Sequence, residues 1–217
     1  MQKVKIYSKF ERFWHWTQML LVLLLAITGF EIHGTVTVFG YEEAVRLHST
    51  SGWVFLVLTI FAAFWMLVTG QSRQFLPVRR NVKSQILYYL TGIFMNKPHP
   101  VPKTLECKLN PLQRIVYFSL IVLVFPVQLI TGFLYMYFHY PQQPVELGGL
   151  GLVAILHTLG AFALMAFIVI HLYLITTGHK VFTNLWSMIT GYEELECGED
   201  IDYEKENTED KHVTSKI

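Results

Sequence analysis

Four histidines fall within or at the ends of long apolar segments of the chain: His15, His48, His157 and His171. A strongly polar side chain at membrane depth is costly, so each of these histidines is a candidate functional residue. A single such histidine would more often make a hydrogen bond between helices. The four together have a spacing that this simpler interpretation does not predict.

His157 and His171 are fourteen residues apart within one apolar segment. In an α-helix this separation is close to four turns and roughly 21 Å along the axis, so both side chains face the same side. If the segment crosses a membrane, it offers one imidazole near each membrane surface. Each imidazole then needs a partner at its own depth.

The elements that position these histidines are predicted from apolar length. Residues 14–32, 48–69, 113–138 and 150–177 are each long enough to cross a bilayer, which takes about 20 residues. The chain is 53% hydrophobic and only 15% charged, with a mean hydropathy of +0.39. The first segment has no small-residue cleavage site and is interpreted as a retained span rather than a signal peptide. We expect an all-α integral membrane protein with a four-helix transmembrane bundle.

The orientation of the bundle follows from its basic residues. The two connections that follow the first and third segments are almost free of lysine and arginine, whereas the other parts of the chain outside the segments are rich in them. The positive-inside rule therefore predicts that both termini and the long middle loop are cytoplasmic. The basic residues concerned are Lys3, Lys5, Lys9 and Arg12 before the first segment, Arg73, Arg79, Arg80, Lys83, Lys97, Lys103 and Lys108 in the middle loop, and Lys180 after the last segment.

This orientation pairs the histidines by depth. His15 enters the first helix at the cytoplasmic end, level with His171, and His48 opens the second helix at the outer end, level with His157. Two opposed histidines at one level are the ligands of a six-coordinate haem, which has no open iron position for oxygen chemistry and serves electron transfer. We predict an outer haem held by His48 and His157 and an inner haem held by His15 and His171. No CxxCH motif is present, so both would be non-covalent haem b.

Small residues and a weak internal repeat support this arrangement. Gly29 is expected at the depth of the outer haem, and Gly52 and Gly160 each lie within one turn of an outer ligand. Either haem space or close helix packing would explain such glycines. The sequence Ile-Thr-Gly-Phe occurs at 27–30 and again at 130–133, which is compatible with a duplicated helical hairpin.

The regions outside the four spans are also informative. Apolar residues recur with helical spacing over 82–95, which predicts an amphipathic helix on the inner membrane surface. A second short helix is expected near 181–191. Residues 1–192 form one predicted membrane domain, and residues 193–217 form an acidic tail that we expect to be disordered or to bind a basic partner.

At these residues the chain resembles the di-haem cytochrome b subunit of membrane formate dehydrogenases, in the superfamily shared with thiosulfate reductase and nickel–iron hydrogenase cytochromes b. The resemblance covers the chain up to about residue 192. Its carriers are Arg-Phe-Trp-His-Trp at 12–16, His48 with Gly52, Tyr-Tyr-Leu at 88–90, Asn-Pro-Leu-Gln-Arg at 110–114, and the pair His157 and His171.

The resemblance implies two b haems and an inner site for menaquinone or ubiquinone. Carried onto this chain, the quinone residues are Asn110, Gln113 and Arg114, since side-chain amides can donate to a quinone carbonyl. Asn110 could equally cap the third helix, with Pro111 at its first position. Leu112 stands where the family often has glycine. Arg12 could bind an inner haem propionate through its bidentate guanidinium or could simply anchor the cytoplasmic side.

The resemblance also implies a multisubunit oxidoreductase in a bacterial or archaeal cytoplasmic membrane. The chain has no Fe–S cysteine motif and no molybdenum, tungsten or nickel site, so the primary substrate chemistry would belong to another subunit. An extracytoplasmic Fe–S subunit or multihaem cytochrome c, with a catalytic subunit, is the expected partner; membrane lipid surrounds the bundle, and no nucleic acid is expected.

Three alternatives stay open. The chain could serve a thiosulfate reductase or a hydrogenase. It could be a stand-alone oxidoreductase of the cytochrome b561 type, although the third helix carries no ligand histidine and the inner loop is long. The remote alternative is a haem-free scaffold or transporter.

Overall fold

The structure, a computed structural model, describes residues 2–95, 97, 100–101, 108–139, 150–177 and 182–195. Over these residues, four helices are long and apolar enough to cross a membrane, as predicted. The loop at 140–149, His99 and His179 lie outside the described residues, as does most of the acidic tail, 196–217.

The first hairpin consists of α1 (Lys9–Ile32) and α2 (Tyr41–Val68), which pack along each other. A capping box starts α1: the Ser8 hydroxyl accepts from the backbone N–H of Glu11, and the Glu11 carboxylate accepts from the backbone N–H of Ser8. Buried Glu31 stabilises the loop between α1 and α2, because its carboxylate accepts hydrogen bonds from the backbone N–H groups of residues 38–40.

The start of α2 differs from the prediction. The helix begins at Tyr41, so His48 lies seven residues inside it rather than at its first turn. The helix extends beyond the apolar segment, because the first two turns of α2 contain charged residues. Glu42 and Glu43 suit the positive end of the helix dipole, and Glu43 pairs with Arg46 one turn later.

The second hairpin pairs α6 (Leu150–Ile175) with a long helix made of α4 (Pro111–Ser119), a π-helical turn at Leu120–Val124, and α5 (Phe125–His139). Asn110 caps α4 and Pro111 occupies its first position. The buried apolar core contains Phe55 of α2 together with Leu120 and Phe125 of the long helix. Few other apolar side chains on the four spans are buried; the rest are exposed or half-buried, as expected for surfaces that face lipid.

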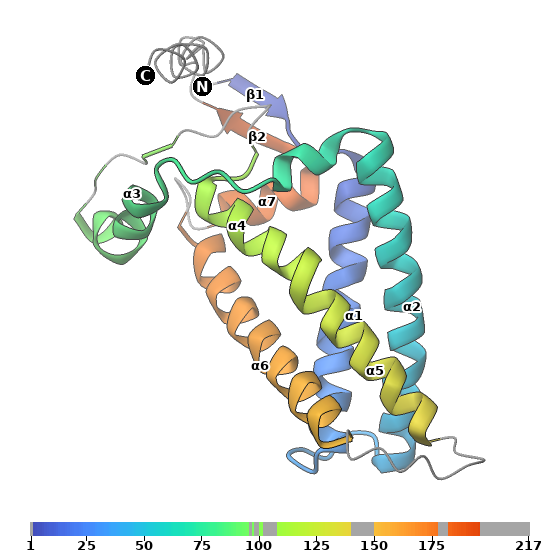
Figure 1. Ribbon diagram of the computed structural model, residues 1–217. Coiled ribbons are helices and arrows are strands. Elements are labelled where there is room, and N and C mark those ends of the chain that lie inside the picture. Colours follow the sequence, from blue (N-terminus) through green and yellow to red (C-terminus); the bar gives the residue numbers. More distant parts are fainter. Residues whose placement is uncertain are drawn as a thin grey trace, which may run out of the picture.

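Short elements gather at one end of the bundle (Figure 1). The segment 82–95 is helical throughout, as α3 (Val82–Leu87), a π-helical turn (Tyr88–Gly92) and a 3-10 turn (Ile93–Met95). A 3-10 helix, Gln71–Phe75, follows α2, and α7 spans Thr183–Thr190.

A small sheet that the sequence analysis did not predict joins the two ends of the described chain. β1 (Gln2–Lys5) pairs antiparallel with β2 (Tyr192–Leu195). The first three residues of the predicted tail, 193–195, are therefore in a strand. With only four residues each and mixed charge, these strands carry no recognisable pattern, and their pairing joins positions about 190 residues apart.

Candidate functional site

The predicted outer half of the bundle, where α1 ends and α2 begins, holds the first histidine pair. His48 of α2 and His157 of α6 face each other with their ring centroids 6.2 Å apart and their ring planes at 71°. Tyr135 of α5 contacts the edge of the His157 ring, with 5.8 Å between centroids. Two hairpins of the fold thus each contribute one histidine to the same level.

The predicted inner half holds the second pair. His15 of α1 and His171 of α6 also have ring centroids 6.2 Å apart, with their planes at 50°. Phe167, one turn earlier on α6, stacks on the His171 ring at 5.4 Å and 21°. Trp16 meets His15 edge to face at 5.4 Å.

Two threonines that the sequence analysis did not select hold the outer histidines. Thr28 Oγ1 lies 2.9 Å from Nδ1 of His48, and Thr131 Oγ1 lies 2.9 Å from Nδ1 of His157. Both are the threonines of the repeated Ile-Thr-Gly-Phe sequence. The repeat was therefore the available signal: in each hairpin, the first helix presents a threonine to the histidine of the second helix.

The glycines of the same repeat lie against the same rings. A Cβ added to Gly29 would come within 3.3 Å of Cε1 of His48, and one added to Gly132 within 3.3 Å of Cε1 of His157. Gly29 thus lies at the level expected for it. The other two glycines do not contact a ligand: Gly160 lies against the Gln128 side chain, and a Cβ at Gly52 would meet nothing within 4 Å.

The predicted quinone residues lie at the start of α4. Asn110 and Gln113 form a capping box in which each side chain accepts from the other's backbone N–H, at 2.8 and 3.0 Å. The remaining donor of Asn110, its amide Nδ2, donates to the hydroxyl of Tyr89 at 2.8 Å. Both oxygens are therefore committed to the cap, and Asn110 is joined to the Tyr89 hydroxyl. Arg114, one turn into the helix, is half-buried.

Arg12 makes its observed contact with α7. Its guanidinium donates to the backbone carbonyl of Ile189, and the indole N–H of Trp16, one turn later on α1, donates to the carbonyl of Met188 at 3.2 Å. These bonds satisfy carbonyl groups at the end of α7, where a helix leaves its last acceptors unpaired. Anchoring is therefore one role of Arg12. Its buried Nε has no hydrogen-bond partner among the described residues and remains available to an anionic group.

The comparison with known proteins gives the family. A model described as "Prokaryotic cytochrome b561" matches residues 6–191. The chain belongs to the prokaryotic cytochrome b561 family. It is also 32% identical over 200 residues to the Escherichia coli (strain K12) protein described as "Putative cytochrome YdhU", across 88% of this chain and 75% of that protein. The prediction of a membrane cytochrome is confirmed. The matching family carries the cytochrome b561 name, which was one of the alternatives, whereas the formate dehydrogenase type stays a prediction.

Membership of the family implies haem b, and the structure allows a test of whether the residues fit it. Two imidazoles that bind one metal ion from opposite sides, with metal–nitrogen bonds of about 2 Å, have ring centroids roughly 6.3 Å apart. Both histidine pairs of this cytochrome have a spacing of 6.2 Å. At the outer level, the two Nδ1 atoms already face threonines, which leaves Nε2 of each ring for the metal. The donor set and its spacing fit a haem bound by two histidines.

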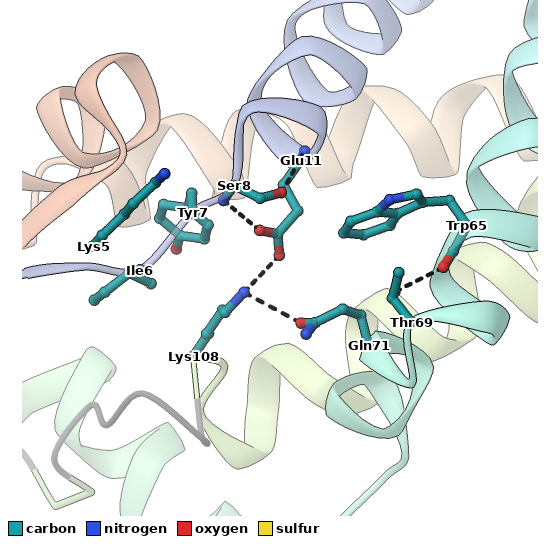
Figure 2. Close-up of a pocket in the computed structure, with 9 residues that line it drawn as sticks. All are labelled: Lys5, Ile6, Tyr7, Ser8, Glu11, Trp65, Thr69, Gln71 and Lys108. Carbon is teal, nitrogen blue, oxygen red and sulfur yellow. Dashed lines mark hydrogen bonds and ion pairs between the residues drawn. The ribbon is translucent and has the colours of Figure 1, made fainter.

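At the end of the bundle where α1 begins, this cytochrome also contains a pocket of about 380 Å³, and most of the residues that line it are polar (Figure 2). Lys108 and Glu11 form an ion pair across it, with 2.7 Å between Nζ and Oε1 and side chains only 10% and 14% exposed. Lys108 also donates to Gln71. Burial and the nearby carboxylates of Glu193 and Glu11 raise the pKa of Tyr7, another lining residue, so its phenol stays protonated. The pocket ties the start of α1 to the segment that precedes Asn110.

Proposed function

We propose that this protein is the membrane anchor and electron-transfer subunit of a respiratory oxidoreductase complex, and that it carries electrons through two b haems between an extracytoplasmic partner and a membrane quinone. The observation that supports the proposal most directly is the equal 6.2 Å spacing of two histidine pairs at two levels of one bundle. Bound haem b supplies reversible one-electron exchange at iron without an open coordination position.

Within this proposal, the chain's own residues set the two levels. His157 and His171 share α6 and are separated by roughly 21 Å along its axis, so the two sites lie near opposite membrane surfaces. His48 and His157 are held by Thr28 and Thr131, and His15 and His171 pack against Trp16 and Phe167.

We assign the end that carries His15 and His171 to the cytoplasm. The basic residues before α1 and those between α2 and α4 gather at this end, and the pairing of β1 with β2 brings both described ends of the chain to it. The acidic side chains Glu31, Glu42 and Glu43 lie at the opposite end. In this orientation, the quinone segment lies on the cytoplasmic side.

For the quinone, we propose a site beside Asn110, Gln113 and Arg114. The Tyr89 hydroxyl accepts from the Asn110 amide, and burial raises the pKa of Tyr89 to about 12. Tyr89 is therefore a protonated phenol at physiological pH, able to donate its own proton in a hydrogen bond to a quinone carbonyl. In this arrangement Asn110 caps α4 and orients Tyr89, and the phenol is the direct donor.

The partner follows from what the chain itself lacks. Its sequence carries no Fe–S cysteine motif, and in the proposed complex the primary substrate reaction takes place in a catalytic subunit, which is joined by an Fe–S protein or a multihaem cytochrome c. The sequence resemblance favours a formate dehydrogenase-like complex over thiosulfate reductase or hydrogenase. The second candidate is a stand-alone cytochrome b561-type oxidoreductase, which the description of the matching family favours.

The test uses the full chain purified from membranes. We expect b-type absorption bands on reduction, two haems per chain, and reduction of the haems by an added quinol. Substitutions His48→Ala and His15→Ala should each remove one haem, and a different one. A protein without b-type bands, or with one haem per chain, would contradict the proposal. Co-purification of an Fe–S subunit favours the complex, whereas reduction of an added quinone by the isolated chain, with a small soluble reductant as electron donor, favours the stand-alone candidate.

A further inference from the structure

The two histidine pairs differ in what holds their Nδ1 atoms. Thr28 donates its single hydroxyl proton to the backbone carbonyl of Leu24 at 2.7 Å, and Thr131 donates its own to Val127 at 2.6 Å. Each threonine oxygen can then only accept from the histidine in front of it. Nδ1 of His48 and of His157 must therefore carry the proton, because a hydrogen bond at 2.9 Å needs one donor.

Both contacts are shielded from water. Thr28 is fully buried and Thr131 is 4% exposed, so no solvent competes for the histidine N–H groups. The outer histidines are thus held in one tautomer, which leaves Nε2 of each ring for a metal.

The inner histidines have no comparable acceptor. Among the described residues, Nδ1 of buried His15 has no hydrogen-bond partner. Nδ1 of His171 lies 3.5 Å from the Tyr117 hydroxyl, which is beyond the usual range for a hydrogen bond to a hydroxyl oxygen. The outer pair has two short bonds to acceptors, and the inner pair has none of that length.

We propose that Thr28 and Thr131 are positioning residues for the outer histidines and that their hydroxyl oxygens give the outer haem a lower reduction potential than the inner one. This inference rests on the proposed function, since it requires a haem at each level. An acceptor on the ring N–H increases the basicity of a ligating histidine. The more basic ligand stabilises the oxidised metal over the reduced one, which lowers the potential. An outer site of lower potential favours electron flow from the outer face to the cytoplasmic face.

The experiment is a spectroelectrochemical titration of the b-type bands, using the full chain in lipid nanodiscs. The variants are Thr28→Val and Thr131→Val, which keep the side-chain shape but lose the acceptor. Thr59→Val is the matched control, because Thr59 makes the same bond to a carbonyl four residues earlier, 2.7 Å to Phe55, without contacting a histidine. Thr28→Ser restores the hydroxyl. Haem content and the low-spin ferric EPR signal of each variant are measured in parallel.

In the unmodified protein we expect two components. Both valine variants should raise the midpoint of the same component, the lower one, and should change its EPR signal. Thr59→Val should leave both midpoints unchanged, and Thr28→Ser should restore the original value. Loss of that one haem in Thr28→Val with retention in Thr28→Ser would equally support the positioning role.

Other results would overturn the inference. Unchanged midpoints in both valine variants would show that the threonines do not act on the ligands. A shift in the higher component would contradict the proposed order of potentials, and an equal shift in Thr59→Val would assign the effect to helix structure. Two haems that share a single midpoint in the unmodified protein would also contradict the proposed order of potentials. One haem per chain would instead contradict the proposed function itself, so the two failures are distinguishable.

Discussion

Gly132 lies directly against the imidazole of His157, so that even a methyl group at Gly132 would come within 3.3 Å of the ring. The same relationship holds between Gly29 and His48 in the other hairpin. These contacts join two helices at the level where a ligand histidine must be held in one orientation. They also explain why two separate helices carry the same Thr-Gly dipeptide.

We predict that Gly29→Ala and Gly132→Ala perturb the outer haem. In a helix, exchange of glycine for alanine is normally favourable by about 1 kcal/mol, so a loss at these sites must come from the histidine contact. The control is Gly52→Ala, because a Cβ at Gly52 meets nothing within 4 Å. Haem content and midpoint potentials are the measurements. Equal behaviour of all three variants would contradict the proposed contact.

We predict that Arg12 has a measurable role beside its bond to α7. If its unpaired Nε binds an inner haem propionate, Arg12→Lys should shift the midpoint of the inner component, since lysine lacks the planar fork. Trp16→Phe is the matched variant, because it removes the other side-chain bond to the end of α7 without removing a charge. An equal effect of both variants would leave Arg12 with the anchoring role alone.

We predict strong coupling between Glu11 and Lys108. Removal of one partner from a buried ion pair leaves the other charge unpaired and costs about 3–5 kcal/mol. Glu11→Gln and Lys108→Met should therefore each lower the thermal stability in detergent, while the double variant should recover most of the loss. Glutamine at position 11 retains an oxygen for the capping box with Ser8. Additive losses in the double variant would show that the pair contributes little.

The sequence carries enough information to place the four spans and to group the histidines by depth, because both depend on length, charge and helical period. The start of α2 could not be predicted from apolar length, because polar turns such as the one with Glu42 and Glu43 extend a helix beyond its apolar segment. The pairing of β1 with β2 could not be predicted either, because the two strands are very short and far apart in the sequence. The roles of Thr28 and Thr131 depend on contacts between helices, and only the repeated Ile-Thr-Gly-Phe pointed to them.

We predict that two substitutions at Asn110 separate its roles as cap and as quinone-site residue. Asn110→Ser retains a capping oxygen for α4 but loses the amide that donates to Tyr89. It should keep the stability of the protein and weaken quinol oxidation, whereas Asn110→Ala should lower both, with a loss of stability of about 1 kcal/mol. Thermal unfolding and the rate of haem reduction by quinol are compared. Unchanged quinol kinetics in Asn110→Ser would remove Asn110 from the quinone site.

We predict that alkaline pH destabilises the protein partly through Tyr89. Burial raises the pKa of Tyr89 to about 12 in the folded protein, whereas an unfolded tyrosine has a pKa of about 10. The contribution of Tyr89 to the free energy of unfolding is fully present below pH 10. Between these values the unfolded chain releases the phenolic proton and the folded chain retains it, so stability decreases as the pH rises.

Tyr89→Phe should flatten this decrease, measured as unfolding temperature against pH, although buried Tyr7 will keep part of it because its pKa is raised as well. The double variant with Tyr7→Phe should flatten it further. A Tyr89→Phe profile as steep as that of the unmodified protein would show that the phenol is already accessible to water. In that case Tyr89 could not be the shielded donor on which the proposed quinone site depends.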